Sequence, residues 1–325
     1  MDPSAHPAAR LTGRLPPRVD VYEVGPRDGL QNELRIVPLD GKLRLIAALV
    51  EAGERRIEAT SFVSPRWIPQ LSDAEDVLKC LPRVPGVTYS ALVPNLKGLE
   101  RAKAAGLGEA AVFISASETH SRKNINKSIA EAVSVAGDVT RGALAAGMRV
   151  RAYLSVVWGC PYEGTVSVER VVELCRRLAD MGIYQLSLGD TVGVGVPNQT
   201  EEILAAVTRH VPVERLALHL HDTRGLALAN ALVGLSAGVT TFDASIGGLG
   251  GCPYAPGAAG NLATEDVVNM LHRMGVETGI DLGKLVEAGE VAQELIGRKL
   301  SGKYLQAALG ERDRAQARRR TVPAH

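Results

Sequence analysis

Short apolar segments rich in β-forming residues alternate with segments of helical periodicity eight times along the chain. In the helical segments apolar residues recur at three-and-four spacing, as in 42–50, and most of these segments end at a glycine. Eight strand–helix units in roughly 250 residues are typical of a closed (β/α)8 barrel. The predicted strands are Val19–Val24, Arg56–Thr60, Val87–Leu92, Ala110–Ser115, Val150–Val156, Ile183–Leu188, Leu216–Leu220 and Val239–Ser245. The glycines expected to end helices are Gly53, Gly106, Gly147, Gly182 and Gly238.

The main alternative to a closed barrel is a doubly wound open sheet, because alternation alone is compatible with both. A dinucleotide-binding sheet would carry its glycine-rich loop after the first strand, whereas here the glycine-rich segment comes late, at 247–251. We therefore predict an α/β chain with one TIM-barrel domain over 19–305, in which 281–305 adds at least one extra C-terminal helix. A flexible N-terminal tail, 1–18, and a basic C-terminal tail, 306–325, flank this domain.

The charge balance excludes partners that bind through bulk electrostatics. Among 325 residues there are 37 Lys and Arg against 36 Asp and Glu, so the net charge is +1. This balance argues against nucleic acid and membrane surfaces as partners, but it allows a small anion held by local cations. No apolar run approaches the ~20 residues of a membrane span.

The cysteines indicate a reducing compartment. Four cysteines without a Cys-x-x-Cys pair do not make a disulfide framework in a chain of this length. We therefore expect a cytoplasmic protein. The first 18 residues lack the apolar segment of a secretory signal, and their prolines oppose the helix of a transit peptide, although a weak one stays open.

Polar residues at the carboxyl ends of the strands are the candidate site, because chemistry lies there in a (β/α)8 barrel. His219 and His221 are two residues apart, so both side chains share one face of a strand and can bind one metal. The first, seventh and eighth strands are neighbours in a closed barrel, so Asp28 and Asn261 converge on them. This mixed set suits Mg²⁺ or Mn²⁺, whereas zinc more often recruits thiolates. A lone His-x-His alternatively consists of two hydrogen-bonded core residues.

Two charged residues and a thiol belong to the same sector of the predicted barrel. Arg27 is either half of a structural ion pair or a cation that faces a developing oxyanion. Glu58 lies in an apolar strand, so it must be paired or functional, because an unpartnered buried carboxylate is costly. Cys252 lies in a glycine-rich loop typical of a mobile flap that presents a thiol, although cysteine is more often a small buried residue.

Other polar residues near strand ends are candidates for binding substrate. Cations close to helix starts can bind phosphate, although the same residues also fit a solvated face. These candidates are Asn95, Lys97, Arg122 and Lys123, together with Ser187, Asp190 and Thr191 at the end of the sixth strand.

Many long motifs in a fixed order connect these residues to one family. Over roughly Val19 to Lys299 the chain resembles 3-hydroxy-3-methylglutaryl-CoA lyases, which belong to a superfamily of metal-dependent lyase and synthase barrels. His-x-His-Asp and Arg-Asp-Gly alone would specify only that superfamily. The longer motifs are VGPRDGLQNE (24–33), TSFVSP (60–65), PNLKG (94–98), RKNIN (122–126), GCPYEG (159–164), SLGDT (187–191), HLHDT (219–223) and GLGGCPYA (248–255).

The resemblance implies cleavage of 3-hydroxy-3-methylglutaryl-CoA, or a close branched analogue, into acetyl-CoA and acetoacetate or the matching 3-oxo acid. In the family, the positions that match Asp28, His219, His221 and Asn261 hold the metal. The Arg27 position stabilises the thioester enolate, the Cys252 position works with the His219 position in proton transfer, and the Glu58 position supports the site. The resemblance also implies an acyl-CoA substrate, Gln31 among its contacts, and a homodimer.

Two departures from the family concern the acyl pocket. Gly247 stands where relatives commonly have alanine, and Thr119 and His120 stand where an apolar pair is common. A roomier or more polar pocket predicts a longer or different acyl branch. The alternatives are a Claisen-type acyl-CoA synthase, which usually carries a C-terminal regulatory domain, and a non-catalytic metal-binding barrel.

Overall fold

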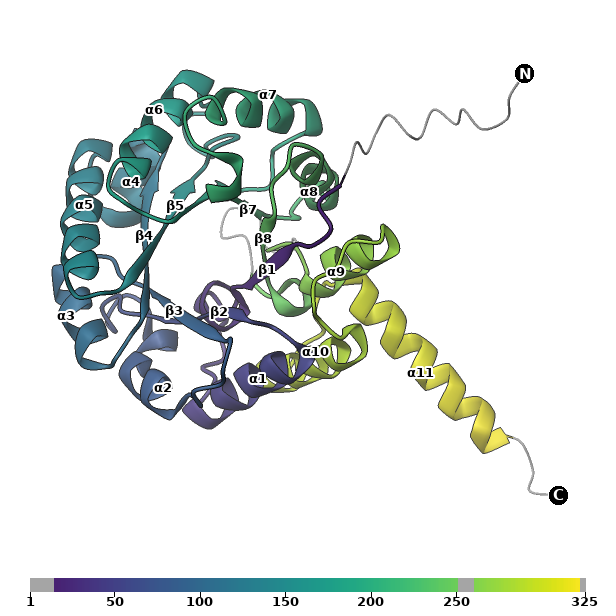
Figure 1. Cartoon of the computed structure of the whole chain (residues 1–325). Coiled ribbons are helices and arrows are strands. Elements are labelled where there is room, and N and C mark those ends of the chain that lie inside the picture. The colour runs from purple at the N-terminus through teal and green to yellow at the C-terminus, as the bar shows by residue number, and fades with distance from the viewer. Residues whose placement is uncertain (1–14, 251–259, 322–325) are drawn as a thin grey trace, which may run out of the picture.

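The computed structural model describes residues 15–250 and 260–321, with side chains up to residue 315. Eight parallel strands form a closed barrel in chain order, and β8 pairs with β1 (Figure 1). Closure confirms the barrel and excludes the open sheet, which would leave two edge strands unpaired. The strands are β1 (Asp20–Glu23), β2 (Arg56–Ser61), β3 (Thr88–Leu92), β4 (Glu109–Ser115), β5 (Arg149–Ser155), β6 (Gln185–Asp190), β7 (Leu216–Leu220) and β8 (Thr241–Ala244).

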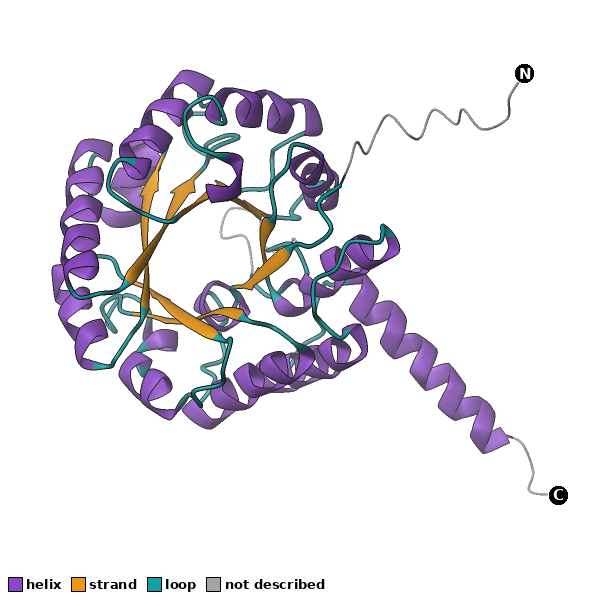
Figure 2. Cartoon of the chain, in the orientation of Figure 1, coloured by secondary structure: helices purple, strands orange, loops and turns teal. Residues whose placement is uncertain are grey.

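All eight predicted strands are confirmed, and their ends agree with the prediction within two residues. The five glycines expected to end helices all have positive φ, the left-handed conformation that closes a helix. Helices surround the barrel, apart from the last one, which projects away from it (Figure 2). They are α1 (Leu39–Ala52), α2 (Ala74–Cys80), α3 (Leu96–Ala104), α4 (Glu118–Ile125), α5 (Ile129–Ala145), α6 (Val168–Ala179), α7 (Pro197–Val207), α8 (Ala227–Ser236), α9 (Thr264–Arg273), α10 (Leu282–Ile296) and α11 (Lys303–Thr321).

Ordered structure continues across both predicted domain boundaries. α10 and α11 supply the extra C-terminal helical segment, and residues 306–321 continue α11. Ala, Gln, Glu and Arg are good helix formers, so a high charge does not oppose a helix here. α11 extends away from the barrel (Figure 1). At the other end, the Pro17 carbonyl accepts a hydrogen bond from the Glu277 N–H at 3.0 Å, so the last residues of 1–18 pair with the barrel domain.

The interior of the barrel is polar, unlike the aliphatic layer between strands and helices. The Arg151 side chain on β5 and Asp243 on β8 are both fully buried and pair with each other. Aliphatic side chains usually fill the interior of a (β/α)8 barrel. The polar groups inside this barrel must therefore form hydrogen bonds or ion pairs with one another. None of the described helices has the length and apolarity needed to cross a bilayer.

Candidate metal and substrate site

Three of the predicted metal ligands meet at the carboxyl end of the barrel. His219 is the last residue but one of β7, His221 directly follows the strand, and Asp28 lies in the single helical turn Gly25–Gly29 after β1. One ligand atom from each of these side chains lies within 4.8 Å of the other two. The Nε2 atom of His219 is 3.3 Å from Nε2 of His221 and 3.9 Å from Oδ2 of Asp28. The structure therefore brings together residues that are nearly 200 positions apart in the sequence.

Asn261, the fourth predicted ligand, joins the same cluster through its backbone and its side chain. Asn261 forms an isolated β-bridge with His221, and its Nδ2 donates a hydrogen bond to Asp28 Oδ2 at 2.9 Å. Burial and the nearby His219 lower the pKa of His221 to about 4, so its imidazole is neutral near pH 7. Burial opposes the ionisation of Asp28, but Arg27, the two histidines and the hydrogen bond from Asn261 together outweigh it and hold the pKa well below its usual value. One carboxylate, one amide and two imidazoles, one of them neutral, fit a divalent cation.

Arg27 and Glu58 form a buried ion pair beside the predicted metal ligands. Arg27 Nε lies 2.5 Å from Glu58 Oε2, and Arg27 Nη1 lies 2.5 Å from Asp28 Oδ1. Burial would lower the pKa of Arg27, but Glu58 and Asp28 outweigh it and raise the pKa, so the guanidinium stays charged. Tyr153 on β5 donates to Glu58 Oε2 at 3.1 Å, and its ring meets the His219 ring edge-on at 5.8 Å. The carboxylate is thus paired, and the guanidinium is fixed next to the predicted metal.

A cavity of about 840 Å³ opens beside this cluster. Its wall includes Arg27, Asp28, His219 and His221. Four of the predicted substrate-binding residues also line it: Gln31, Asn95, Lys123 and Thr191. The buried Oε1 atom of Gln31 has no hydrogen-bond partner among the described residues, so it is an unused acceptor at the cavity.

The other four predicted substrate contacts do not line the cavity, because each side chain is directed elsewhere. Ser187 is buried and donates to Asp243 at 2.8 Å. Asp190 accepts hydrogen bonds from the backbone N–H groups of Val194 and Gly195 at 3.0 and 2.9 Å. Arg122 forms an exposed ion pair with Glu118, and Lys97 is exposed in the first turn of α3.

The thiol predicted to act in proton transfer, Cys252, lies outside the described residues. The loop that leads to it is held by a residue that the sequence analysis did not select. Glu23 Oε1 accepts from the N–H groups of Gly25 and Ile246 at 2.7 and 3.0 Å, and its Oε2 accepts from the Thr264 hydroxyl at 2.7 Å. Glu23 therefore joins the loops after β1 and β8. The signal was present, because Glu23 is an acid in an apolar strand, as Glu58 is.

Glu265 supports the same β8 loop and gives the protein a pH-dependent stability. Its Oε2 accepts from the Gly247 N–H at 2.7 Å, and burial raises its pKa from an ordinary 4.5 to about 8. Between these values the folded protein holds a proton that the unfolded chain has released, so the free energy of unfolding falls as pH rises.

We expect the free energy of unfolding to fall from pH 5 to pH 8, with Glu265 contributing up to about 1.4 kcal/mol per pH unit. Glu265→Gln, which keeps an acceptor for Gly247, should show a shallower decline and exceed the parent protein in stability at pH 8. Urea unfolding across this pH range measures both slopes. Parallel slopes for the two proteins would show that Glu265 does not hold the proton.

Of the two departures from the family, one lies in the cavity wall and the other does not. His120 lines the cavity, and its Nδ1 lies 3.0 Å from the Ser115 hydroxyl, so the polar departure is in the cavity wall. Gly247 is not on that wall, and a Cβ added to it would meet Leu300 Cδ1 at 2.4 Å. The expectation that Gly247 enlarges the pocket is therefore wrong, because Leu300 fills the space of the absent methyl group.

Gly247→Ala should destabilise the protein by about 1–3 kcal/mol without changing its preference among acyl branches. Gly247 has φ 61, which a residue with a Cβ rarely adopts, and the new methyl group would overlap Leu300. Thermal unfolding, together with kcat/KM for two acyl-CoA substrates, checks both parts. A changed substrate preference at unchanged stability would restore the pocket interpretation.

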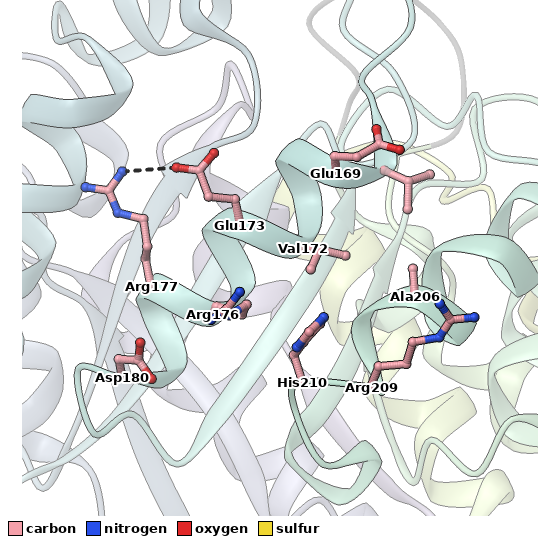
Figure 3. Close-up of a pocket in the computed structure, with 10 residues that line it drawn as sticks. Glu169, Val172, Glu173, Arg176, Arg177, Asp180, Ala206, Arg209 and His210 are labelled. Carbon is pink, nitrogen blue, oxygen red and sulfur yellow. Dashed lines mark ion pairs between the residues drawn. The ribbon is translucent and has the colours of Figure 1, made fainter.

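A second pocket, of about 430 Å³, lies outside the barrel between α6 and α7 (Figure 3). Charged side chains of both signs line it, and Arg177 pairs with Glu173 at 3.6 Å. None of its residues belongs to the group of close metal-binding side chains found in the described part of the chain. The cavity at the carboxyl end of the barrel is therefore the candidate active site.

Comparison with known proteins places the chain in a family. A family model described as HMGL-like matches residues 18–292. This chain belongs to the HMGL-like family of TIM-barrel lyases. The mitochondrial hydroxymethylglutaryl-CoA lyase of Rattus norvegicus is 54% identical over 295 residues, which are 91% of each chain. Hydroxymethylglutaryl-CoA lyase YngG of Bacillus subtilis is 51% identical over 291 residues, covering 90% of this chain and 97% of the relative.

Solved structures agree with the family assignment. The HMG-CoA lyase of Bacillus subtilis has a TM-score of 0.89 at 51% identity and covers 90% of this chain and 98% of that one. An HMG-CoA lyase from Acinetobacter baumannii, solved in complex with coenzyme A and 3-methylmalate, has a TM-score of 0.85 at 39% identity, with coverages of 89% and 95%. These matches confirm both the fold and the family resemblance of this HMGL-like protein.

Proposed function

We propose that this HMGL-like protein cleaves 3-hydroxy-3-methylglutaryl-CoA, or a close branched analogue, into acetyl-CoA and acetoacetate or the matching 3-oxo acid. One observation carries the proposal: Asp28, His219 and His221 converge on the wall of a cavity that Arg27 also lines. The names of relatives more than 50% identical over 90% of the chain support the same reaction.

Cleavage of the carbon–carbon bond needs a deprotonated tertiary hydroxyl and a stabilised carbanion. Asp28, His219, His221 and Asn261 would hold the metal, for which we propose Mg²⁺ or Mn²⁺. A bound divalent cation supplies the positive charge that makes the substrate hydroxyl easier to deprotonate.

The chain's own residues meet the charge that develops next. The departing carbanion is delocalised onto the thioester oxygen, and Arg27, held charged by Glu58, is placed to face that negative charge. Because the guanidinium is buried and already oriented, its interaction with the enolate needs little reorganisation. The enolate then takes a proton from a nearby acid, for which Cys252 together with His219 remains the prediction.

The proposal also covers the compartment, the oligomeric state and the partners of the enzyme. We propose a cytoplasmic protein, supported by the free thiols of Cys80, Cys160 and Cys175 among the described residues. We also propose a homodimer, which the family resemblance implies. Neither nucleic acid nor a membrane is a proposed partner, because the net charge is +1.

The decisive experiment assays a panel of branched 3-hydroxyacyl-CoA thioesters for release of acetyl-CoA, with Mg²⁺ or Mn²⁺ and with a chelator. We expect metal-dependent release from 3-hydroxy-3-methylglutaryl-CoA or from a longer-branched analogue, and its loss with chelator. No acetyl-CoA from any member of the panel would refute the lyase proposal. Net condensation from acetyl-CoA and a 3-oxo acid under the same conditions would favour a synthase instead.

A further inference from the structure

The barrel interior connects His219 to a carboxylate that the sequence analysis did not select. Asp243 lies on β8, which neighbours β7 in the barrel, and His219 and Asp243 are partners in the strand register. The Nδ1 atom of His219 lies 3.2 Å from Asp243 Oδ2, which also accepts the Ser187 hydroxyl at 2.8 Å. The Asp243 side chain has no solvent exposure. Within the described residues, its negative charge is therefore satisfied by these contacts and by a buried cation.

Arg151 supplies that cation from β5. Both of its terminal guanidinium nitrogens donate to Asp243, with Nη1 at 3.1 Å from Oδ2. Its Nε donates to Gln185 Oε1 at 2.9 Å, and its guanidinium carbon lies 4.0 Å from the centre of the Tyr22 ring. A bidentate, buried partner thus keeps the carboxylate ionised and fixed.

The two ring nitrogens of His219 face different partners. Nδ1 faces Asp243, whereas Nε2 faces His221 and Asp28 at 3.3 and 3.9 Å. An ionised carboxylate only accepts hydrogen bonds, so the neutral imidazole must carry its hydrogen on Nδ1. The lone pair on Nε2 is then directed toward the other metal ligands.

We propose that Asp243, held by Arg151, is a positioning residue that fixes His219 as the Nδ1–H tautomer and makes Nε2 available to the metal. The inference rests on the metal site in the proposed function, but not on the reaction that the site catalyses. Carboxylate partners of metal-binding histidines orient the ring and raise its basicity, and their loss typically lowers metal affinity 10–100-fold.

Asp243→Asn tests the proposal, because asparagine keeps the shape of aspartate and an acceptor for Arg151. Its amide N–H₂ can donate to His219 Nδ1, and this reverses the tautomer and places a hydrogen on Nε2. We expect the metal-free variant to bind Mn²⁺ about 10–100-fold more weakly than the parent protein, measured by calorimetric or EPR titration.

Gln185→Ala is the matched control, because it removes a different hydrogen bond of Arg151 and does not touch His219. We expect it to unfold at a lower temperature and to keep the parental Mn²⁺ affinity. Parental affinity in Asp243→Asn would overturn the proposal. Equal weakening in both variants would also overturn it, because Asp243 would then act only through the stability of the barrel.

Nitrogen-15 NMR of the metal-free parent protein gives a readout that does not depend on the Asp243 variant. With histidine side chains labelled and His219 assigned by comparison with His219→Gln, we expect a protonated Nδ1 and an unprotonated Nε2. A protonated Nε2 in the parent protein would overturn the proposal. Both measurements omit substrate, so a protein that passes them but does not cleave any thioester would refute the lyase function and leave the role of Asp243 intact.

Discussion

Arg27→Ala should lower the rate of thioester cleavage by about a thousandfold, the upper effect of removing one donor to a developing oxyanion. The loss should appear in kcat, because the negative charge on the thioester oxygen exists only as the bond breaks. Steady-state kinetics with saturating metal measures it. Turnover within tenfold of the parent protein would show that Arg27 does not face the reacting thioester.

The same substitution should also destabilise the fold, so activity needs a matched control. Glu58 is fully buried and pairs with Arg27, and removing one partner of such a pair costs about 3–5 kcal/mol. Adding Glu58→Gln removes the unpaired charge, so the double variant Arg27→Ala with Glu58→Gln should regain stability but not turnover. Recovery of turnover with stability would mean that Arg27 acts only through the fold.

His221→Ala should weaken Mn²⁺ binding by at least about a hundredfold. Losing a residue that only hydrogen-bonds a metal ligand weakens binding by up to about this factor, and losing a ligand itself should weaken it more. The imidazole offers Nε2 to the cluster, while its buried Nδ1 has no hydrogen-bond partner among the described residues. Its removal therefore deletes a ligand without breaking a second hydrogen bond.

Titration with Mn²⁺ and turnover as a function of metal concentration check this prediction. His210→Ala, which changes an exposed histidine in the pocket between α6 and α7, is the control and should leave both unchanged. Unchanged Mn²⁺ affinity in His221→Ala would remove His221 from the metal site. Partial recovery of turnover at high metal concentration would support the assignment, because a weaker site can still be filled by mass action.

The strands and the meeting of Asp28, His219 and His221, which we predict to hold a metal, were predictable from short-range spacing and from the order of the strands. A period of two places His219 and His221 on one face of a strand, and eight repeats imply that the first and last strands are neighbours. Asp243 and Glu23 are acids in apolar strands, as Glu58 is, but they were not among the predicted site residues. Their roles depend on which residues of other strands they contact in the closed barrel, and the sequence alone does not show these contacts.

Directions of side chains were the weakest predictions. Ser187 and Asp190 were expected at the end of a strand, but Ser187 donates to Asp243 inside the barrel and Asp190 accepts hydrogen bonds from the following loop. Gly247 was expected at the pocket, yet its open side is filled by Leu300 from the segment before α11. A side chain's direction depends on backbone angles and on packing against distant segments, so neighbours in sequence do not reveal it.

The sequence by itself determined the eightfold strand–helix repeat, the family, and the residues Arg27, Asp28, His219, His221 and Asn261 as one site. These follow from residue spacing and from motif order, which are local properties of the chain. Only the tertiary structure decided that Glu58 neutralises Arg27, that Asp243 and Arg151 stand behind His219, and which candidates reach the cavity. Closing the barrel brings distant strands within hydrogen-bonding distance, and burial there makes each charge depend on a specific partner.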